Sequence, residues 1–252
     1  PLTRTPDAHF LTEVRYKGTK VVSVSPDYAE STTSSDAWLN VKAGTDAALA
    51  MAMGHVILKE YYIDKETPYF KEYAKEFTDM PFLVRVEDIN GTVQPGRFLN
   101  AKDLGRQEEG ADFQMVLIDE LTNEIVVPNG TMGERHTHPE KWNLRLENRD
   151  TGAKIDPRLS VFDQREDVTV VKLPYFGDEE HEGIIERAIP TITVQTVDGP
   201  MKVTTVYDLI LANYGIDRGI GGEVATAYTD DTPYTPTWQE KITGVKADIA
   251  IA

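Results

Sequence analysis

Residues 20–62 read KVVSVSPDYAESTTSSDAWLNVKAGTDAALAMAMGHVILKEYY. A β-branched apolar run at residues 21–24 stops at Ser25-Pro26-Asp27, and after a polar segment Gly44-Thr45-Asp46 opens a long apolar helix. A strand, a turn and a helix N-terminus in this order form the geometry in which α/β proteins hold phosphate-bearing ligands. The stretch therefore predicts an α/β fold that binds a cofactor at this place, with the reacting groups elsewhere.

The composition narrows the class of protein. The chain has 252 residues, enough for one large core or two modest ones, and a formal net charge of −16. Such an acidic surface argues against direct binding to nucleic acid or anionic lipid. No apolar run approaches the ~20 residues that span a bilayer. Because the chain has no cysteine, disulfides and thiolate-held zinc or iron–sulfur sites within it are excluded.

Periodicity and turn signals predict alternating helices and strands. Helices are expected at residues 6–18, 45–62, 69–77, 204–214 and 235–244, and strands at 20–24, 36–41, 82–86 and 191–194. Residues 115–118 and 125–127 are expected to pair as a hairpin, and Asn90-Gly91 to form a turn. Asn129-Gly130 is another turn signal, and after it charged, Gly- and Pro-rich loops are expected to dominate to about residue 186.

Burial follows from the same patterns. The strand at residues 20–24 is nearly all apolar, as a buried parallel strand is, and the helix at 45–62 is expected to be largely buried. Tyr69, Phe70, Tyr73 and Phe77 recur at helical spacing, which is typical of core positions more than of a cofactor box.

The expected organisation has three parts. Residues 1–80 form an α/β cofactor-binding segment, 81–190 a loop-rich mixed α+β insertion, and 191–252 a return to a Rossmann-like, doubly wound α/β core. Residue 1 is proline, and residues 245–252 resemble an amphipathic helix cut off just after it starts. We therefore expect an internal piece of a longer polypeptide.

Two turns carry the candidate binding residues. Asp27 follows a strand, where a carboxylate can accept hydrogen bonds from ribose or base; the alternative is that it caps the next helix, the commoner use. Gly44, Thr45 and Asp46 offer backbone N–H groups, a hydroxyl and a carboxylate, again with capping as the alternative. The sequence has neither the glycine-rich dinucleotide fingerprint nor a P-loop, which disfavours an ordinary NAD or P-loop site.

The remaining candidates favour structural roles. His136-Thr137-His138 has a metal-like spacing, with Glu134, Glu140 and His181 available, but falls in a segment that is more simply a solvated loop. His55 on the apolar helix is more often a satisfied core histidine than a ligand. The acidic run at residues 178–182 is most simply a solvated loop, and no serine–histidine–aspartate order stands out.

Several motifs resemble one known family over the whole chain. They are residues 4–10 (RTPDAHF), 12–20 (TEVRYKGTK), 26–30 (PDYAE), 44–48 (GTDAA), 51–56 (MAMGHV), 78–81 (TDMP), 128–130 (PNG), 174–177 (PYFG), 203–209 (VTTVYDL), 212–215 (ANYG), 234–236 (YTP) and 242–245 (ITGV). Together they resemble the catalytic α subunit of respiratory membrane-bound nitrate reductase, a molybdopterin oxidoreductase related to dimethyl sulfoxide reductase. The likeness is most specific in the first sixty residues.

The resemblance implies a molybdenum bis(molybdopterin guanine dinucleotide) cofactor and a nearby [4Fe-4S] cluster. In that family the two turns approach a guanosine portion of the cofactor, which implies cofactor contact for Ser25, Pro26, Asp27, Gly44, Thr45 and Asp46. Many relatives have Asp-Pro-Arg where this chain has Pro26-Asp27-Tyr28, a departure that leaves the side-chain roles at 26–28 open. The family's molybdenum and cluster ligands lie upstream of the matched region, so no residue here is expected to be catalytic or a metal ligand.

The resemblance also implies an activity and partners. An intact subunit would reduce nitrate to nitrite with electrons from quinol, passed through an iron–sulfur β subunit and a quinol-oxidising membrane γ subunit. It would be held at the membrane through those partners, on the cytoplasmic or the opposite face, and would not bind nucleic acid. The alternatives are the same region of a nitrite oxidoreductase α subunit and a non-catalytic α/β binding domain. The isolated piece is not expected to reduce nitrate.

Overall fold

A computed structural model describes residues 5–29, 32–129, 145–175 and 183–252. The chain divides into two compact units, one of residues 1–56 and 225–252 and the other of residues 57–224. The predicted division at residues 80 and 190 stays a prediction. None of the helices in the described ranges combines the length and the apolar character that crossing a bilayer requires.

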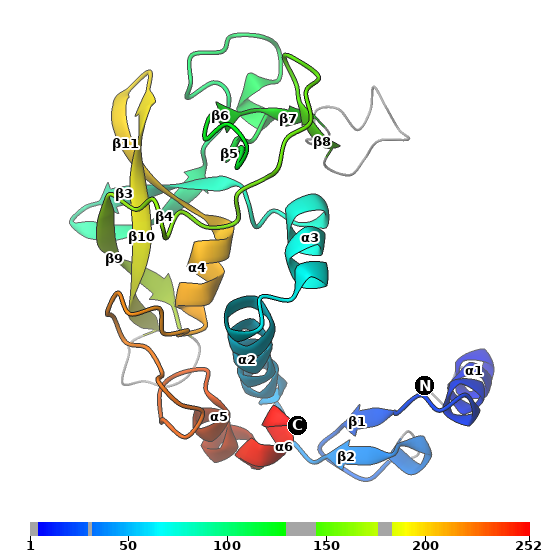
Figure 1. The fold of residues 1–252 in the computed structure, drawn as a ribbon. Coiled ribbons are helices and arrows are strands. Elements are labelled where there is room, and N and C mark those ends of the chain that lie inside the picture. The colour runs from blue at the N-terminus through cyan, green and yellow to red at the C-terminus, as the bar shows by residue number, and fades with distance from the viewer. Residues whose placement is uncertain (1–4, 30–31, 130–144, 176–182) are drawn as a thin grey trace. The chain divides into compact units, whose positions relative to one another are not determined.

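The first unit combines short helices with two parallel strands (Figure 1). Its elements are α1 (Thr5–Tyr16), β1 (Val22–Val24), η1 (Thr32–Ser34), β2 (Ala37–Leu39), α2 (Asp46–Ile57), α5 (Pro236–Thr243) and α6 (Ala247–Ile251). Leu39, Val41 and Leu49 form a small core with Val245 and Ala250. Residues from the two ends of the chain therefore share one core.

The burial expected for this unit is only partly found. β1 is parallel to β2, as predicted, but Val22 and Val24 are 55% and 47% exposed, so the prediction of a buried strand is wrong. The physical reason is that β1 and β2 form a sheet of two strands among the described residues, whereas larger parallel sheets have helices that cover both faces. In α2 five residues are buried, but Met53 and Ile57 are exposed.

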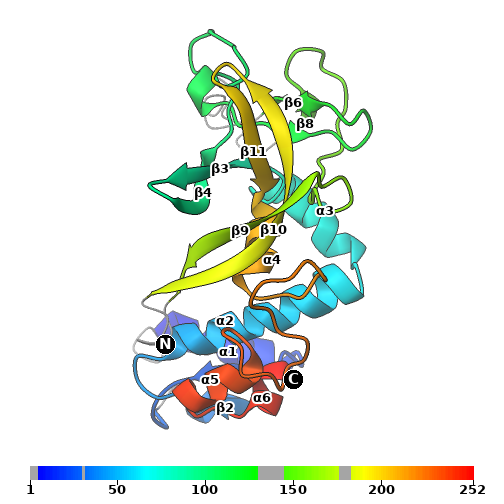
Figure 2. The ribbon, with the colours of Figure 1, turned by 90° about the vertical axis from the view of Figure 1, so that its left-hand side faces the viewer.

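The second unit is built on a five-stranded antiparallel sheet with the strand order β4-β3-β11-β10-β9. Its strands are β3 (Leu83–Ile89), β4 (Thr92–Phe98), β9 (Asp167–Pro174), β10 (Ile184–Thr196) and β11 (Gly199–Thr205). β10 pairs with β9 along its first part and with β11 along its last part (Figure 2). The two outer strands, β4 and β9, also contact one another, so the sheet is curled.

Short turns explain why this sheet is antiparallel. Asn90 and Gly91 join β3 to β4 with φ values of 57° and 83°, the positive angles that a two-residue hairpin turn requires. Val197 and Asp198 join β10 to β11 in the same two-residue manner. The mixed α/β class is thus confirmed. The doubly wound parallel arrangement stays a prediction. Among the described residues, β1 and β2 are the strands that pair in parallel.

Helices and small hairpins complete the second unit. They are η2 (Leu58–Asp64, a π-helical segment), α3 (Pro68–Phe77), η3 (Ala111–Phe113), α4 (Val206–Asn213), and the hairpins β5 (Leu117–Ile118) with β6 (Ile125–Val126) and β7 (Pro128–Asn129) with β8 (Arg145–Asn148). The predicted hairpin at residues 115–127 is confirmed. The predicted helix at 45–62 changes to π-helical geometry at Leu58.

Two sequence expectations fail in this unit. The loops expected up to residue 186 give way to β9, in which Val171 and Leu173 are buried while Val170 and Lys172 are exposed. Of the four aromatic residues on α3, Phe70 packs against the core, but Tyr69, Tyr73 and Phe77 are exposed. The reason is geometric. Residues 69, 73 and 77 form one stripe along α3, and this stripe faces away from the side of the helix on which Ala74 is buried.

Candidate functional site

Both predicted turns leave the same edge of the β1–β2 pair. The register joins Val24 to Leu39, the last residues of the two parallel strands. The N–H of Ser25 continues this pairing by donating to the Leu39 carbonyl at 3.1 Å. The Ser25–Asp27 turn and the segment that leads to Gly44 therefore both begin at the carboxyl edge, where open α/β sheets bind ligands.

The turn after β1 is held by its own serine. The Ser25 hydroxyl donates to the Asp27 carbonyl at 2.8 Å and lies 3.3 Å from the Asp27 carboxylate. Pro26 and Asp27 are exposed. Among the described residues the Asp27 carboxylate accepts from Ser25 alone, and η1 begins with a backbone bond from Thr32 to Ala29. Within that part of the chain Asp27 caps no helix.

The turn after β2 positions the start of α2. Gly44 has a φ of +81°, in the left-handed region that favours glycine, and a Cβ there would meet nothing within 4 Å. The Thr45 hydroxyl donates to the Lys42 carbonyl at 2.7 Å. Asp46, the first residue of α2, is exposed. The Thr45 hydroxyl thus stabilises the loop, and the Asp46 carboxylate lies at the positive end of a twelve-residue helix.

The loop is also fixed to the C-terminal end of α5. The N–H of Lys42 donates to the carbonyl of Thr243 at 2.9 Å, and Thr243 is fully buried. The hydroxyl of Thr243 in turn donates to the side chain of Gln239 at 2.6 Å. Residues 239–243 therefore hold the loop before α2 in place, a contribution that no sequence motif near Gly44 could indicate.

Asp36 joins the other end of the strand pair to α1. Its carboxylate accepts the Val21 N–H at 2.7 Å and pairs with the Arg15 guanidinium at 3.0 Å. The Val21 hydrogen bond, followed by the bond from Arg15, holds the pKa of Asp36 below its ordinary value of 3.8. Asp36 is therefore ionised at neutral pH and fixes where both strands begin.

The histidine predictions have different outcomes. His55 is buried and packs edge-on against Tyr228, with ring centroids 6.0 Å apart, so its prediction as a core histidine is confirmed. His136, Thr137, His138, Glu134, Glu140 and His181, and the acidic run, lie outside the described residues. Within the described ranges no three histidine or acidic side chains are grouped so that they could hold a metal ion.

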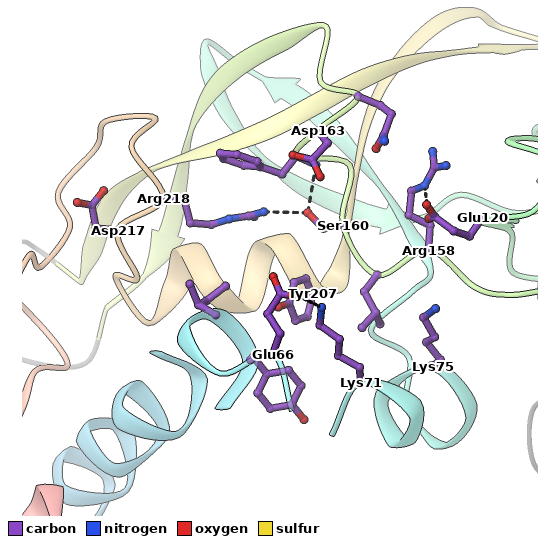
Figure 3. Close-up of a pocket in the computed structure, with 15 residues that line it drawn as sticks. Glu66, Lys71, Lys75, Glu120, Arg158, Ser160, Asp163, Tyr207, Asp217 and Arg218 are labelled. Atoms are coloured by element: carbon purple, nitrogen blue, oxygen red, sulfur yellow. Dashed lines mark hydrogen bonds and ion pairs between the residues drawn. The ribbon is translucent and has the colours of Figure 1, made fainter. Parts of the chain in front are cut away.

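The second unit has a cavity of about 620 Å³ between η2, α3, α4 and the loop around Ser160 (Figure 3). Its basic residues each face an acidic partner: Lys71 with Glu66 at 2.6 Å, Lys75 with Asp156 at 2.6 Å, Arg158 with Glu120 at 2.6 Å, and Arg218 with Asp208. Burial raises the pKa of the Tyr207 phenol, which therefore stays protonated at neutral pH. The positive charges that line the cavity are thus compensated by carboxylates. The predicted site residues belong to the other unit.

Residues 2–220 match the sequence profile of the molybdopterin oxidoreductase family, and the chain belongs to this family. Over 251 residues it is 49% identical to the nitrate reductase alpha chain of Bacillus subtilis (strain 168), a match that covers 100% of this chain and 20% of that relative. It is 45% identical over 258 residues to the respiratory nitrate reductase 1 alpha chain of Escherichia coli (strain K12), covering 97% and 21% of the two chains.

A third relative is named for another substrate. The chlorate reductase subunit alpha of Ideonella dechloratans is 37% identical over 248 residues, covering 98% of this chain and 19% of that relative. The chain therefore spans about a fifth of the length of these curated relatives. Family membership implies a molybdopterin cofactor.

The chemistry of the carboxyl edge fits one part of such a cofactor. Asp27 and Asp46 present carboxylates, and Ser25 a hydroxyl, all of which can accept hydrogen bonds from sugar hydroxyls or base N–H groups. The two carboxylates repel phosphate. The backbone N–H groups at the start of α2 are better suited to bind phosphate. The chain has no cysteine that could hold an iron–sulfur cluster.

Proposed function

We propose that this chain is part of the catalytic subunit of a molybdenum-dependent nitrate reductase and holds the nucleotide tail of its cofactor. The observation that carries the proposal is that the Ser25–Asp27 turn and the segment that leads to Gly44–Asp46 both begin at the carboxyl edge of two parallel strands. The identities of 49% and 45% to nitrate reductase alpha chains support the assignment of the subunit.

Each residue of the edge has a distinct role in this proposal. Asp27 and Asp46 accept hydrogen bonds from the ribose hydroxyls and the base of a molybdopterin guanine dinucleotide. Ser25 and Pro26 hold the first turn, while Gly44 and Thr45 present the start of α2 to the tail. In the full-length subunit β1 and β2 belong to a larger doubly wound parallel sheet, whose flanking helices cover Val22 and Val24.

The reaction belongs to the intact subunit. The bis(molybdopterin guanine dinucleotide) cofactor supplies, at its molybdenum, the transfer of an oxygen atom that converts nitrate to nitrite. The electrons come from quinol by way of a [4Fe-4S] cluster, an iron–sulfur β subunit and a membrane γ subunit, which also hold the complex at the membrane on its cytoplasmic face. The role of residues 1–252 is to bind and orient the cofactor.

Nitrite oxidoreductase is the competing function. It would use the same cofactor and oxidise nitrite to nitrate. The redox partners and their potentials decide the direction of the reaction, and the carboxyl edge of β1 and β2 does not. The names of the two most similar relatives described above favour nitrate over chlorate as the substrate, because the chlorate reductase is 37% identical. Steady-state assays of the full-length enzyme with nitrate, nitrite and chlorate distinguish these reactions.

The binding role is tested on the full-length protein with Asp46→Asn. This change keeps the size of the side chain but replaces one acceptor oxygen with an NH₂ donor, which faces the donor groups of the nucleotide. We expect fewer guanine nucleotides and less molybdenum per subunit, measured as GMP released by acid hydrolysis and by metal analysis.

The matched control is Asp7→Asn. Asp7 is also an exposed acid in the first turn of a helix of the same unit, so it shares the interaction with the helix dipole but lies on α1. Its cofactor content is expected to equal that of the unaltered protein. Full cofactor content in both Asp46→Asn and Asp27→Asn would contradict the proposed function.

A further inference from the structure

One face of α3 in the second unit carries three exposed aromatic rings. Tyr69, Tyr73 and Phe77 are 68%, 48% and 50% exposed. The rings contact one another in order, with centroids 6.3 Å apart between Tyr69 and Tyr73 and 5.2 Å apart between Tyr73 and Phe77. They therefore form one continuous patch, which we call the aromatic stripe, and a continuous exposed apolar patch is typical of an interaction surface.

The helix that carries the aromatic stripe is fixed on its core side. Phe70 packs against the core cluster that contains Leu58 and Leu211, and Ala74 of that cluster is fully buried. The ring of Tyr69 meets that of Phe70 edge to face, with centroids 5.6 Å apart. Side chains that are already held in place lose little conformational entropy on binding, so the stripe is prepared to receive a partner.

Acidic side chains border the aromatic stripe. Glu72 and Glu76 follow Tyr69 and Tyr73 by three residues, a spacing that places them beside the stripe on the surface of the helix, and both are exposed. The exposed face of α3 therefore combines rings with negative charge.

The lysines of α3 do not compensate this charge, because other carboxylates bind them. Lys71 pairs with Glu66 and Lys75 with Asp156, each at 2.6 Å. Within the described ranges the carboxylates of Glu72 and Glu76 form no such ion pair. A partner that covers the aromatic stripe must therefore supply the cations itself.

The surface next to the aromatic stripe shows how such rings bind a cation. The Lys65 Nζ lies 4.4 Å from the centroid of the Tyr61 ring and 2.8 Å from the Glu60 carboxylate. The Tyr61 ring in turn contacts Phe70 of α3, with centroids 5.4 Å apart. A ring face and a carboxylate both attract a cation, so an arginine or lysine of a docking segment can bind between the stripe and its acids in the same way.

A basic segment of the same polypeptide fits this surface best. A second copy of the chain would bring two acidic faces together, and its formal net charge of −16 adds to the repulsion. The chain spans about a fifth of the length of its curated relatives, so a subunit of that length has about four times as much polypeptide outside residues 1–252. A segment tethered within one subunit has a high effective concentration, which favours a permanent cover for exposed rings.

We propose that the aromatic stripe is the docking surface for an arginine- or lysine-bearing segment of the same subunit that lies outside residues 1–252. Cations of that segment pair with Glu72 and Glu76, and its apolar residues cover the rings. The proposal rests on the proposed function, because it requires the chain to be part of a larger catalytic subunit. It adds a role for the second unit, whereas the two turns of the candidate site belong to the first.

Photo-cross-linking of the full-length subunit, purified with its cofactor, identifies the occupant. The photoreactive amino acid p-benzoylphenylalanine is incorporated in place of Tyr73, and the linked peptides are mapped by mass spectrometry after irradiation. We expect a linked peptide from the same polypeptide, outside residues 1–252, with arginine or lysine beside apolar residues. The control is the same amino acid in place of Phe113, a 54% exposed ring of η3 in the same unit, which should not link to that peptide.

Charge reversal tests whether the acids select the segment. Glu76→Lys is expected to lower the yield of the linked peptide about threefold, the equivalent of about 0.7 kcal/mol for an exposed ion pair. Replacement of the facing cation of the linked segment by glutamate should restore the yield, which a merely structural role of Glu76 would not allow. Glu109→Lys, which changes another exposed acid of the same unit, is the control and should leave the yield unchanged.

Each contrary result has a defined meaning. The absence of a linked peptide, or a link to a second copy or to another protein, overturns the proposal. A linked segment without arginine or lysine, or a yield that Glu76→Lys leaves unchanged, overturns it as well. The proposed function is measured separately, as the guanine nucleotide content of the Asp27 and Asp46 variants, so its failure is distinguishable from failure of the docking surface.

Discussion

The carboxylate of Asp208 connects several segments of the second unit. It accepts hydrogen bonds from the Ser160 hydroxyl at 2.6 Å, the Val161 N–H at 2.9 Å and the Thr205 hydroxyl at 2.9 Å, and it pairs with Arg218. Its side chain is fully buried and that of Arg218 is 12% exposed. One residue thus joins α4 to two loops of the cavity wall.

The substitution Asp208→Asn tests this role. It removes the charge that compensates Arg218 in a buried place, and breaking such a pair leaves an unpaired cation whose desolvation is not offset. We expect the free energy of unfolding, measured by urea denaturation, to fall by about 3 kcal/mol.

Asp217→Asn is the control for the same charge change. Asp217 accepts the Gly219 N–H at 2.8 Å, which an amide oxygen can also accept, so the loss is expected to stay below about 0.5 kcal/mol. Equal losses in the two variants would show that the buried pair with Arg218 contributes nothing specific.

At the scale of elements, the β1–β2 pair depends on the contacts of Asp36. Because the pKa of Asp36 is lowered on folding, its contribution to stability is present above the ordinary value of 3.8 and is lost as the pH falls through the lowered value. Hydrogen exchange should therefore show the Val21 amide protected at neutral pH and unprotected in strong acid. In Asp36→Ala this amide should show little protection, relative to its intrinsic exchange rate, at every pH.

Asp27→Ala is the control for the exchange of the Val21 amide. Among the described residues the Asp27 carboxylate accepts only from Ser25, so its removal should leave the Val21 amide protected. If Asp36→Ala also left Val21 protected, the hydrogen bond between them would not hold the start of β1, and the strand pair would be fixed by other contacts.

Local signals in the sequence identified most elements. Thr205 and Thr235 cap α4 and α5 by accepting the N–H groups of Asp208 and Trp238, each at 3.1 Å, and Gly244 ends α5 with a φ of 81°. The Asn90-Gly91 signal likewise predicted a turn, which the structure places between β3 and β4. Such signals act within a few residues, so they can be recognised without knowledge of the tertiary fold.

Contacts between distant residues could not be predicted in this way. No strand was expected at β9, and β10 begins seven residues before the strand expected at 191–194. The pairing of β9 with β10 depends on register across the sheet. The bond from Trp38 to Ser25 likewise exists only because β1 and β2 are parallel and in one register. The sequence indicated the two turns of the candidate site, but not this bond from Trp38 or the loop contact from Lys42 to Thr243.

At the scale of the whole chain, each unit has its own core. Leu83, Leu99 and Val203 belong to one core cluster of residues 57–224, and Leu58, Tyr207 and Leu211 to another. The first unit, in contrast, needs residues from both ends of the chain to form its core.

A fragment of residues 57–224 is therefore expected to fold alone. It should unfold cooperatively on heating and give a circular dichroism spectrum rich in β-structure. The fragment of residues 1–56 is the control and should not unfold cooperatively, because Val245 and Ala250 complete its core. Loss of cooperativity in the larger fragment would show that it depends on the other unit.

The five-stranded sheet and the β1–β2 pair differ in how they expose their edge strands. In the curled sheet the outer strands β4 and β9 approach one another, although they stand at opposite ends of the strand order. Among the described residues β1 pairs with β2 alone, and Val22 and Val24 are exposed, so the other side of β1 is a template for a foreign strand. Self-association of the isolated chain is therefore expected to start at β1, and a charged residue at Val22 would be the change that suppresses aggregation.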